Sequence, residues 1–456
     1  MSQEESDNPC GAAPAGGALP SAEPAQWVHW FRSVAPYLHL HHGRTFVISF
    51  SGEVVADPRR LNRLVMDLSL MAAVGIRLVV VPGAKPQIEE LMALRHIEGR
   101  SYKGLRITDT DVMACVKEAC GHVRFEVEAA FSQGLPNTPM QHSHMRVVSG
   151  NFVTAKPIGV VDGVDYRLTG VVRKVDAEAI NEQLARGNIV LVSPFGFSPT
   201  GEAFNMTTKE VATAIACTLK ADKLIISGPR EGVTHQGRVE RELAREDVER
   251  RLAQNLFSEE DAFDLACAVR ALKAGVERVH ILPCRMDGAM LLELFTHEGV
   301  GTMVAEDDMH AMREATIEDV GGLLKLLEIY EADGTLVKRP REKLEREIQH
   351  FTVLEHDGII YGSAALYPYP EAKMGEMAAV TVHPSHQGSG DGDRLLRRVE
   401  QRARAMGLKR IFVLTTRTAH WFLKRGFTAA DVSSLPMEKQ KLYNWNRRSL
   451  IFIKDL

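Results

Sequence analysis

Cysteine is scarce in this sequence, and the six that occur are scattered along it. None forms a C-x-x-C pair, and no group of His and Cys has zinc spacing, so we expect neither a disulfide scaffold nor a metal. No apolar run is long enough to cross a bilayer. The net charge is −4, which does not favour nucleic acid as a main partner. We therefore expect a cytoplasmic protein without a membrane or nucleic-acid partner.

The length of 456 residues, with 45% hydrophobic and 25% charged residues, is typical of two or three globular domains. Residues 1–25 are rich in Ala, Pro, Gly and Glu and lack the apolar core of a signal peptide, which predicts a disordered tail. The polar residues 305–311 predict a linker. The expected domains are therefore 26–304 and 312–456.

The first domain alternates strand-like and helix-like stretches. A helix over 61–74 separates its first two strands, and a glycine turn after the second strand leads into another helix. The stretch between the helix that starts at 88–93 and the strand at 188–193 is interpreted as a middle section of loops and hairpins. Strand, helix and strand in succession predict an α/β fold with a parallel sheet. The expected strands are 45–50, 76–81, 188–193, 223–227 and 279–282.

The most informative stretch lies in the second domain. A β-rich apolar run over 375–382 ends before Pro384, and a glycine-rich turn then leads into an amphipathic helix. Such a turn exposes backbone N–H groups at a helix N-terminus, which makes an anion-binding site. The turn reads Gln387-Gly388-Ser389-Gly390-Asp391-Gly392.

This arrangement resembles the GCN5-related N-acetyltransferase (GNAT) fold, whose acyl-CoA signature is Q/R-x-x-G-x-G/A between a strand and a helix. A second mark of that family, an aromatic pair before Gly-Phe, is present as Trp421-Phe422 and Gly426-Phe427. The resemblance implies acetyl-CoA as cosubstrate, with its pyrophosphate on the turn and its pantetheine arm along the strand. An ordinary glycine turn is the alternative. The expected acetyl-CoA-binding residues are Val380, Val382, Gln387, Gly388, Ser389, Gly390, Gly392 and Asp393.

Acetyl transfer to an amine needs a base for the amine, donors for the thioester oxygen and a proton for the leaving thiolate. Glu376 starts the strand that leads to the acyl site and is the candidate base; a solvated strand-end carboxylate is the alternative. A backbone N–H near Val380 is the expected oxyanion donor. Thr415 ends the neighbouring strand and is a second catalytic candidate. The acid for the thiolate is not identified, because no Tyr lies near Trp421.

Three arginines, Arg339, Arg417 and Arg447, are candidates to hold an acidic substrate, because arginine binds carboxylates through paired hydrogen bonds. Taken alone, each of them is more often a surface arginine than a residue that binds a ligand. Over about residues 26–456, however, the chain closely resembles the bacterial N-acetylglutamate synthase family. The resemblance rests on Leu414–Arg417, His420–Phe422, Arg425–Phe427 and Gly375–Ala378, and on Gly75–Val81, Val148–Phe152, Asp162–Tyr166 and Gly299–Thr302.

That resemblance implies acetylation of the α-amino group of L-glutamate, the first step of arginine biosynthesis. Carried over by position, Arg339 and Arg447 would hold the glutamate carboxylates, with help from the backbone at Val337 and Ala379. Glu376 would be the base. The neighbouring Arg448 leaves the assignment of Arg447 open.

The first domain resembles the amino acid kinase fold, a parallel-sheet sandwich, and most closely N-acetylglutamate kinase. Ser49 stands where the kinases carry a Lys that stabilises the transferring phosphoryl group. The phosphate loop H-G-G-G is replaced around Pro82–Lys85, and the Asp of the later T-D-x-x-G-V motif is gone in Ser227–Val233. A retained fold without this chemistry indicates regulation.

The resemblance further implies that this domain binds L-arginine as an allosteric inhibitor near residues 295–302 and the N-terminal helix. Glu298 suits the guanidinium of arginine, while His297 and backbone N–H groups at Gly299 and Gly301 suit its carboxylate. The alternative is that these residues are only a helix end followed by a polar loop, with no ligand. Relatives form rings through these domains, so we expect a homo-oligomer, a hexamer.

The sequence therefore predicts an acetyl-CoA:L-glutamate N-acetyltransferase with an arginine-sensing, kinase-like domain. Two rivals remain. One is a bifunctional acetyltransferase and kinase, against which Ser49 argues. The other is an amino-acid sensor whose GNAT domain is inactive or acts on another amine, such as a protein lysine; the intact turn 387–392 weakens the inactive version.

Overall fold

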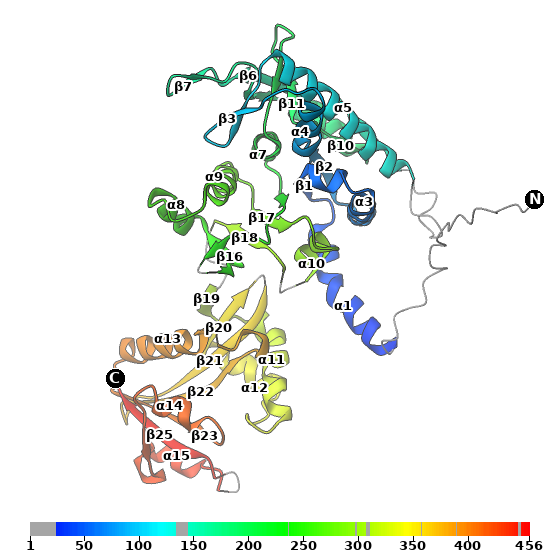
Figure 1. The fold of residues 1–456 in the computed structure, drawn as a ribbon. Helices are drawn as coiled ribbons and strands as arrows, with labels where there is room; N and C mark the ends of the chain where they lie inside the picture. Colours follow the sequence, from blue (N-terminus) through cyan, green and yellow to red (C-terminus); the bar gives the residue numbers. More distant parts are fainter. Residues whose placement is uncertain are drawn as a thin grey trace, which may run out of the picture. The chain divides into compact units, whose positions relative to one another are not determined.

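The computed structural model describes residues 24–133, 145–235, 237–296, 299–306, 311–356, 358–388, 390–445 and 448–456. The chain divides into two compact units, whose described residues end at Glu306 in the first and begin at Ala311 in the second (Figure 1). Within these ranges no helix is long and apolar enough to cross a membrane.

The first unit is built on an eight-stranded sheet of order β16-β18-β17-β13-β1-β2-β10-β5. Every pair in this sheet is parallel except β17 with β18. The predicted parallel sheet is therefore confirmed for six strands, while β18 and β16 at one edge run in the opposite direction. The strands are β1 (Thr45–Phe50), β2 (Arg77–Pro82), β5 (Val147–Ser149), β10 (Ile189–Leu191), β13 (Lys223–Gly228), β16 (Glu242–Ala244), β17 (Arg278–Pro283) and β18 (Thr302–Ala305).

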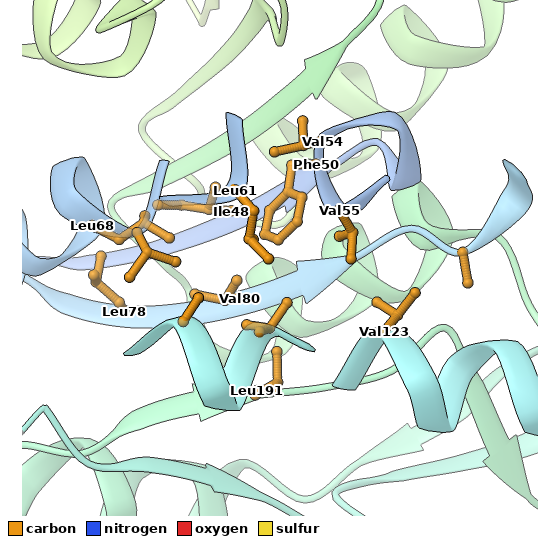
Figure 2. Packing of buried hydrophobic residues seen from close by; sticks show 14 of the residues in the cluster. Ile48, Phe50, Val54, Val55, Leu61, Leu68, Leu78, Val80, Val123 and Leu191 are labelled. Carbon is orange, nitrogen blue, oxygen red and sulfur yellow. The ribbon is translucent and has the colours of Figure 1, made fainter. Parts of the chain in front are cut away.

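Helices cover both faces of this sheet, which explains why its strands read as continuous apolar runs. Ile48 and Val80 point into a cluster with α3 and α5, part of which Figure 2 shows, while Val47 and Val79 pack against α7 and α9. The helices are α1 (Pro24–His41), α2 (Gly52–Val55), α3 (Pro58–Ala73), α4 (Lys85–Leu94), α5 (Thr110–Ser132), α6 (Ala177–Ala185), α7 (Thr208–Leu219), α8 (Arg245–Ala253), α9 (Glu259–Lys273) and α10 (Ala289–Phe295).

The middle section is only partly loops and hairpins, and that expectation was wrong for α5, a helix of 23 residues. Its buried residues Val112, Val116, Val123 and Val127 follow helical spacing and fill the core beside β1 and β2. The section does hold hairpins and a second sheet of order β12-β11-β6-β9. The strands are β3 (Arg100–Tyr102), β4 (Leu105–Ile107), β6 (Val153–Pro157), β7 (Val160–Val161), β8 (Val164–Asp165), β9 (Gly170–Val175), β11 (Phe195–Phe197) and β12 (Ala203–Asn205). A further hairpin, β14 (Thr234–His235) with β15 (Arg238–Val239), follows β13.

The second unit is a seven-stranded sheet of order β19-β20-β21-β22-β23-β25-β24. Helix α13 packs on one face, and α11 and α12 pack on the other (Figure 1). The strands are β19 (Ala311–Glu314), β20 (Phe351–His356), β21 (Ile359–Tyr369), β22 (Met374–Val382), β23 (Arg410–Thr415), β24 (Thr428–Ala430) and β25 (Leu450–Asp455). The α-helices are α11 (Val320–Ala332), α12 (Arg341–Glu347), α13 (Asp391–Ala405), α14 (Ala419–Leu423) and α15 (Met437–Lys441).

Candidate active site

The sheet of the second unit opens at its centre, between β22 and β23. These two strands are parallel but pair at only three positions, from Met374 with Arg410 to Glu376 with Phe412. Beyond Glu376, β22 stays with β21 as far as Val382, whereas β23 stays with β25 as far as Thr415. No described strand pairs with the free edge of β22 after this fork. That edge can form strand-like hydrogen bonds with an extended ligand.

A β-bulge lies on β22 just after the fork. Ala364 of β21 faces two residues, Ala379 and Val380, because the register shifts between Ala378 and Thr381. Ala379 takes a left-handed conformation with φ of 49°, and its carbonyl accepts a hydrogen bond from Ser363 Oγ at 3.0 Å. The bulge therefore redirects the backbone of Ala379 and Val380 at the point where the sheet opens.

Glu376 occupies the fork itself and is 8% exposed, which rules out a solvated strand-end carboxylate. Lys439 Nζ of α15 lies 2.7 Å from Oε1 and 2.6 Å from Oε2 of this carboxylate. The Tyr369 hydroxyl donates to Oε2 at 3.4 Å. Burial, together with the Glu376 carboxylate, raises the pKa of Tyr369. Sequence reasoning missed both Lys439 and Tyr369.

Thr415 ends β23 on the other side of the opening. It lies three residues beyond the Phe412–Glu376 pair, so it is about 10 Å further along the strand. Its Oγ1 accepts the N–H of Thr418 at 3.1 Å and lies 2.8 Å from Thr418 Oγ1. Thr415 is thus fixed by a local turn and is not in contact with Glu376.

The glycine turn has the local geometry that its sequence predicts. Gly388 and Gly390 have φ of 95° and 92°, a left-handed conformation that favours glycine, and Gly390 directly precedes α13. Gln387 Nε2 donates to Val382 O at 3.3 Å and to the Tyr330 hydroxyl at 2.9 Å. Tyr330, from α11, also donates to Val382 O and was not predicted. Ser389 lies outside the described residues.

Two residues of the first turn of α13 face α14. Asp393 was predicted to bind acetyl-CoA, but its carboxylate is bonded to Arg425, and its N–H donates to Gly390 O at 3.0 Å. Gly392 lies against the indole of Trp421. These contacts connect the start of α13, directly after the glycine turn, to the aromatic pair Trp421-Phe422.

The candidate substrate arginines lie in different surroundings. Arg339 donates from Nη1 to Val337 O at 3.3 Å and interacts with Tyr367, the residue directly opposite Glu376 in the sheet. Opposed residues of an antiparallel pair share a face, so Arg339 lies on the face of Glu376. Arg417 is exposed and pairs with Asp333 at 3.1 Å. Arg447 lies outside the described residues.

The predicted effector residues His297 and Glu298 also lie outside the described residues, whereas Gly299, Val300 and Gly301 lie within them. Glu293 Oε2 accepts the N–H groups of Val300 at 2.7 Å and Gly301 at 3.0 Å, and His280 Nδ1 lies 2.8 Å from Oε1. Burial raises the pKa of Glu293, but the hydrogen bonds from His280, Val300 and Gly301 outweigh it and lower that pKa to about 2. Gly301 packs so closely that a Cβ would lie 2.3 Å from the carbonyl oxygen of Ile281. Glu293 was not predicted.

In the first unit, the positions that correspond to phosphate-handling residues of the kinases are either buried or bonded to other side chains. Ser49 is 2% exposed and donates to Ile225 O at 3.3 Å, so no cation stands there. Lys209 forms an ion pair with Asp264, and Arg230 bridges Asp264 and Asp261. Among the described residues no group of His, Cys, Asp and Glu could hold a metal ion.

A sheet that forks beside a glycine turn at a helix start, with a carboxylate buried in the fork, defines an acyltransferase domain of the GNAT type. Residues 323–427 match the acetyltransferase (GNAT) family, and residues 44–283 match the amino acid kinase family. The chain belongs to the amino-acid acetyltransferase family, in which a kinase-like domain precedes a GNAT domain. It is therefore an enzyme, and the predicted fold class is confirmed.

Two relatives support this assignment along nearly the whole chain. The amino-acid acetyltransferase of Ralstonia nicotianae is 53% identical over 96% of this chain and 97% of its own. That of Pseudomonas syringae pv. syringae is 48% identical over 94% of this chain and 100% of its own.

A solved structure supports it as well. N-acetylglutamate synthase from Neisseria gonorrhoeae, in complex with coenzyme A and L-arginine, matches with a TM-score of 0.82 and 36% identity over 94% of this chain and 99% of its own. The same enzyme in complex with coenzyme A and N-acetyl-glutamate matches with a TM-score of 0.60 and 37% identity over the same shares. The resemblance to the N-acetylglutamate synthase family is confirmed.

Proposed function

We propose that this protein transfers the acetyl group of acetyl-CoA to the α-amino group of L-glutamate, as the first step of arginine biosynthesis, under feedback inhibition by L-arginine. The observation that carries this proposal is the fork, where a buried Glu376 stands at the start of an unpaired, bulged strand edge. The gonococcal enzyme, which binds coenzyme A with N-acetyl-glutamate or L-arginine, supports the choice of ligands.

Acetyl-CoA is the cosubstrate. Its pantetheine arm would pair with the free edge of β22 at Val380 and Val382, and its pyrophosphate would lie on the turn from Gln387 to Gly392. The carbonyl oxygen of Val382 accepts hydrogen bonds from Tyr330 and Gln387. These hydrogen bonds must break before the pantetheine arm can pair with this oxygen. The thioester would then reach the bulge, where the Val380 N–H would be the oxyanion donor.

The chemistry is a direct transfer. Glu376 accepts a proton from the substrate ammonium, and the freed amine attacks the thioester carbonyl carbon. The carbonyl oxygen becomes an oxyanion near the Val380 N–H, and the attacking nitrogen becomes positively charged. The C–S bond then breaks, and the proton that this nitrogen loses neutralises the leaving thiolate of the coenzyme. Lys439 and Tyr369 hold Glu376 in place before the substrate arrives, and Thr415 stands across the opening.

Recognition of glutamate would come from its two carboxylates. Arg339, which lies on the face of Glu376, would bind one of them. Arg447 or Arg417 would bind the other, and the backbone at Val337 and Ala379 would assist. The charge of these groups favours a small acidic substrate over the side chain of a protein lysine.

For the first unit we propose an arginine-binding role at His297, Glu298, Gly299 and Gly301. Glu293 accepts hydrogen bonds from the N–H groups of Val300 and Gly301 in the described part of this loop. The hexamer and the cytoplasmic location stay predictions from the sequence. A kinase activity is disfavoured by the neutral, buried Ser49 and by the pairing of Lys209 and Arg230 with carboxylates.

A thiol-release assay tests the proposal. Purified protein receives acetyl-CoA with glutamate, ornithine or a lysine peptide, each with and without L-arginine. We expect release of coenzyme A with glutamate alone and inhibition by L-arginine. Turnover with the lysine peptide but not with glutamate would contradict the substrate, and ATP-dependent phosphorylation of N-acetylglutamate would support the bifunctional rival.

A further inference from the structure

The first turn of α13 is held from behind by an aromatic ring. A Cβ added to Gly392 would lie 3.1 Å from Cζ2 of Trp421, which is too close for any side chain without movement of the indole. The φ of Gly392 is not positive, so the ring and not the backbone conformation requires a glycine here. Trp421 in turn contacts Phe422 edge to face at 4.9 Å. The indole is therefore a fixed support for the turn that carries the anion site.

Arg425 connects this support back to the same turn. Its guanidinium carbon lies 4.0 Å from the centre of the Trp421 ring, a cation–π contact, and its Nη1 donates to Trp421 O at 3.0 Å. Its Nε and Nη2 both donate to the carboxylate of Asp393, the latter at 3.0 Å. Each nitrogen of the guanidinium thus has a partner within the protein. Arg425 closes a ring of contacts that runs from Gly392 through Trp421 to Asp393.

This pairing also changes the charge at the anion site. Asp393 lies in the first turn of α13, directly after the glycine turn, and its side chain is 43% exposed. An unpaired carboxylate there would repel an incoming pyrophosphate, since like charges at short range oppose each other. The hydrogen bonds of Arg425 keep the pKa of Asp393 below its usual range, so the carboxylate stays ionised, while the guanidinium balances its charge.

We propose that Arg425 is a positioning residue for the coenzyme: through Trp421 and Asp393 it holds the first turn of α13 in its anion-binding geometry and cancels the negative charge beside it. Arg425 acts without touching the reacting atoms. This inference rests on the proposed use of acetyl-CoA, and it concerns only the pyrophosphate end of that molecule.

The test compares two thioesters in the full-length protein. Acetyl-CoA carries the pyrophosphate, whereas S-acetylpantetheine has the same reacting end without it. Arg425→Gln should raise the KM for acetyl-CoA about tenfold, equivalent to ~1.4 kcal/mol, with little change in kcat. The kcat/KM for S-acetylpantetheine should stay the same. Arg404→Gln, which removes an exposed charge at the other end of α13, is the matched control and should change neither.

A second substitution separates the two roles of Arg425, which are to balance the charge of Asp393 and to hold the first turn of α13. Asp393→Asn in the Arg425→Gln background removes the unbalanced carboxylate and should recover at least half of the lost affinity on a logarithmic scale. Arg425→Lys keeps the charge but not the paired hydrogen bonds, and it should fall between the wild type and Arg425→Gln. The same order should appear in coenzyme A affinities from calorimetry.

Equal losses with both thioesters would overturn the proposal, because a general structural defect does not distinguish them. A double variant as weak as Arg425→Gln would overturn the charge balance. If the wild type binds coenzyme A but does not acetylate glutamate, the proposed function fails, while the calorimetric comparison still decides the role of Arg425. If Arg425→Gln does not fold, Arg425→Lys and Asp393→Asn carry the comparison, and unchanged coenzyme affinity in both would contradict the proposal.

Discussion

The side chain of Glu376 is bonded to a group that comes from far along the chain. Lys439 is 63 residues away in sequence, and only the fold brings α15 beside the fork. Glu376 itself could be found from the sequence, because it starts the strand before the glycine turn. No local pattern marks Lys439, which follows Pro436 in a short, mostly polar helix. The partners of a site residue are therefore what sequence reasoning misses, even where the residue is found.

The role of Glu376 gives the first prediction. Glu376→Gln keeps the shape of the side chain but cannot accept a proton, so kcat with glutamate should fall at least about a hundredfold. The KM for acetyl-CoA should change little, because the proposed coenzyme contacts on β22, Val380 and Val382, lie further along the strand. Steady-state kinetics of coenzyme A release measure both constants, with the exposed Glu371→Gln as control. Unchanged turnover would remove Glu376 as the base.

Arg339 gives a prediction about the substrate. Arg339→Ala should raise the KM for glutamate about 10- to 100-fold, because a charged hydrogen bond contributes about 1.5–3 kcal/mol. Initial rates over a range of glutamate concentrations at saturating acetyl-CoA measure this effect. Arg341, two residues on, forms an exposed pair with Glu345, so Arg341→Ala is a matched control. Equal KM values for Arg339→Ala and the wild type would move the substrate site elsewhere.

At the scale of elements, the strand, turn and helix from β22 to α13 were predicted closely, because local chemistry determines each part. A β-rich run, two glycines with positive φ and an amphipathic face all lie within one short stretch. The fork between β22 and β23 could not be predicted, since it depends on which strands separate. Helix α5 is different, because its apolar residues do follow helical spacing in the sequence. The predicted turns on either side of it led to the wrong expectation of loops and hairpins.

Helix α1 offers a prediction about pH. His41, at its end, is 3% exposed, and its Nε2 lies 2.7 Å from Leu294 O of α10. Burial lowers the pKa of His41 to about 4, with Lys223, His280 and Arg278 adding repulsion. The folded protein then binds fewer protons than the unfolded chain below pH 6.5. Stability from His41 is complete above pH 6.5 and decreases by up to about 3 kcal/mol as the pH falls toward 4.

Chemical denaturation between pH 7 and pH 4 measures this effect as a difference between variants. His41→Asn should lose stability at pH 7 but show a shallower decrease toward pH 4, because the group that must remain neutral is gone. His39→Asn, on the exposed side of the same helix, should follow the wild type. A pH dependence of His41→Asn that is as steep as that of the wild type would contradict the assignment.

At the scale of the whole molecule, the order of a kinase-like unit and a GNAT unit was predicted correctly because both carry recognisable strand and turn patterns. The proposed inhibition by L-arginine has no such pattern. The two predicted effector side chains precede a loop whose N–H groups at Val300 and Gly301 are already bonded to Glu293. The sequence predicts Glu298, which lies outside the described residues and stays a prediction. No local pattern marks the buried Glu293, whose carboxylate accepts these N–H groups.

Regulation gives the fourth prediction. Glu298→Ala should weaken inhibition by L-arginine at least about tenfold while leaving the uninhibited rate unchanged, because a guanidinium would lose its charged partner. Rates at increasing L-arginine, with fixed acetyl-CoA and glutamate, measure the inhibition. Glu306, paired with Arg245 in the same unit, provides the control Glu306→Gln. Full inhibition of Glu298→Ala would place the effector elsewhere.

The support of α13 by Trp421 has a practical consequence, because it gives the enzyme an optical reporter. Of its four tryptophans, Trp30 and Trp445 are 55% and 67% exposed, whereas the Trp421 indole lies between a glycine of the anion site and a guanidinium. A ligand that settles on that turn would alter the fluorescence of Trp421 before any bond is made or broken. Arrival of the coenzyme could then be followed in real time, without a label and without turnover.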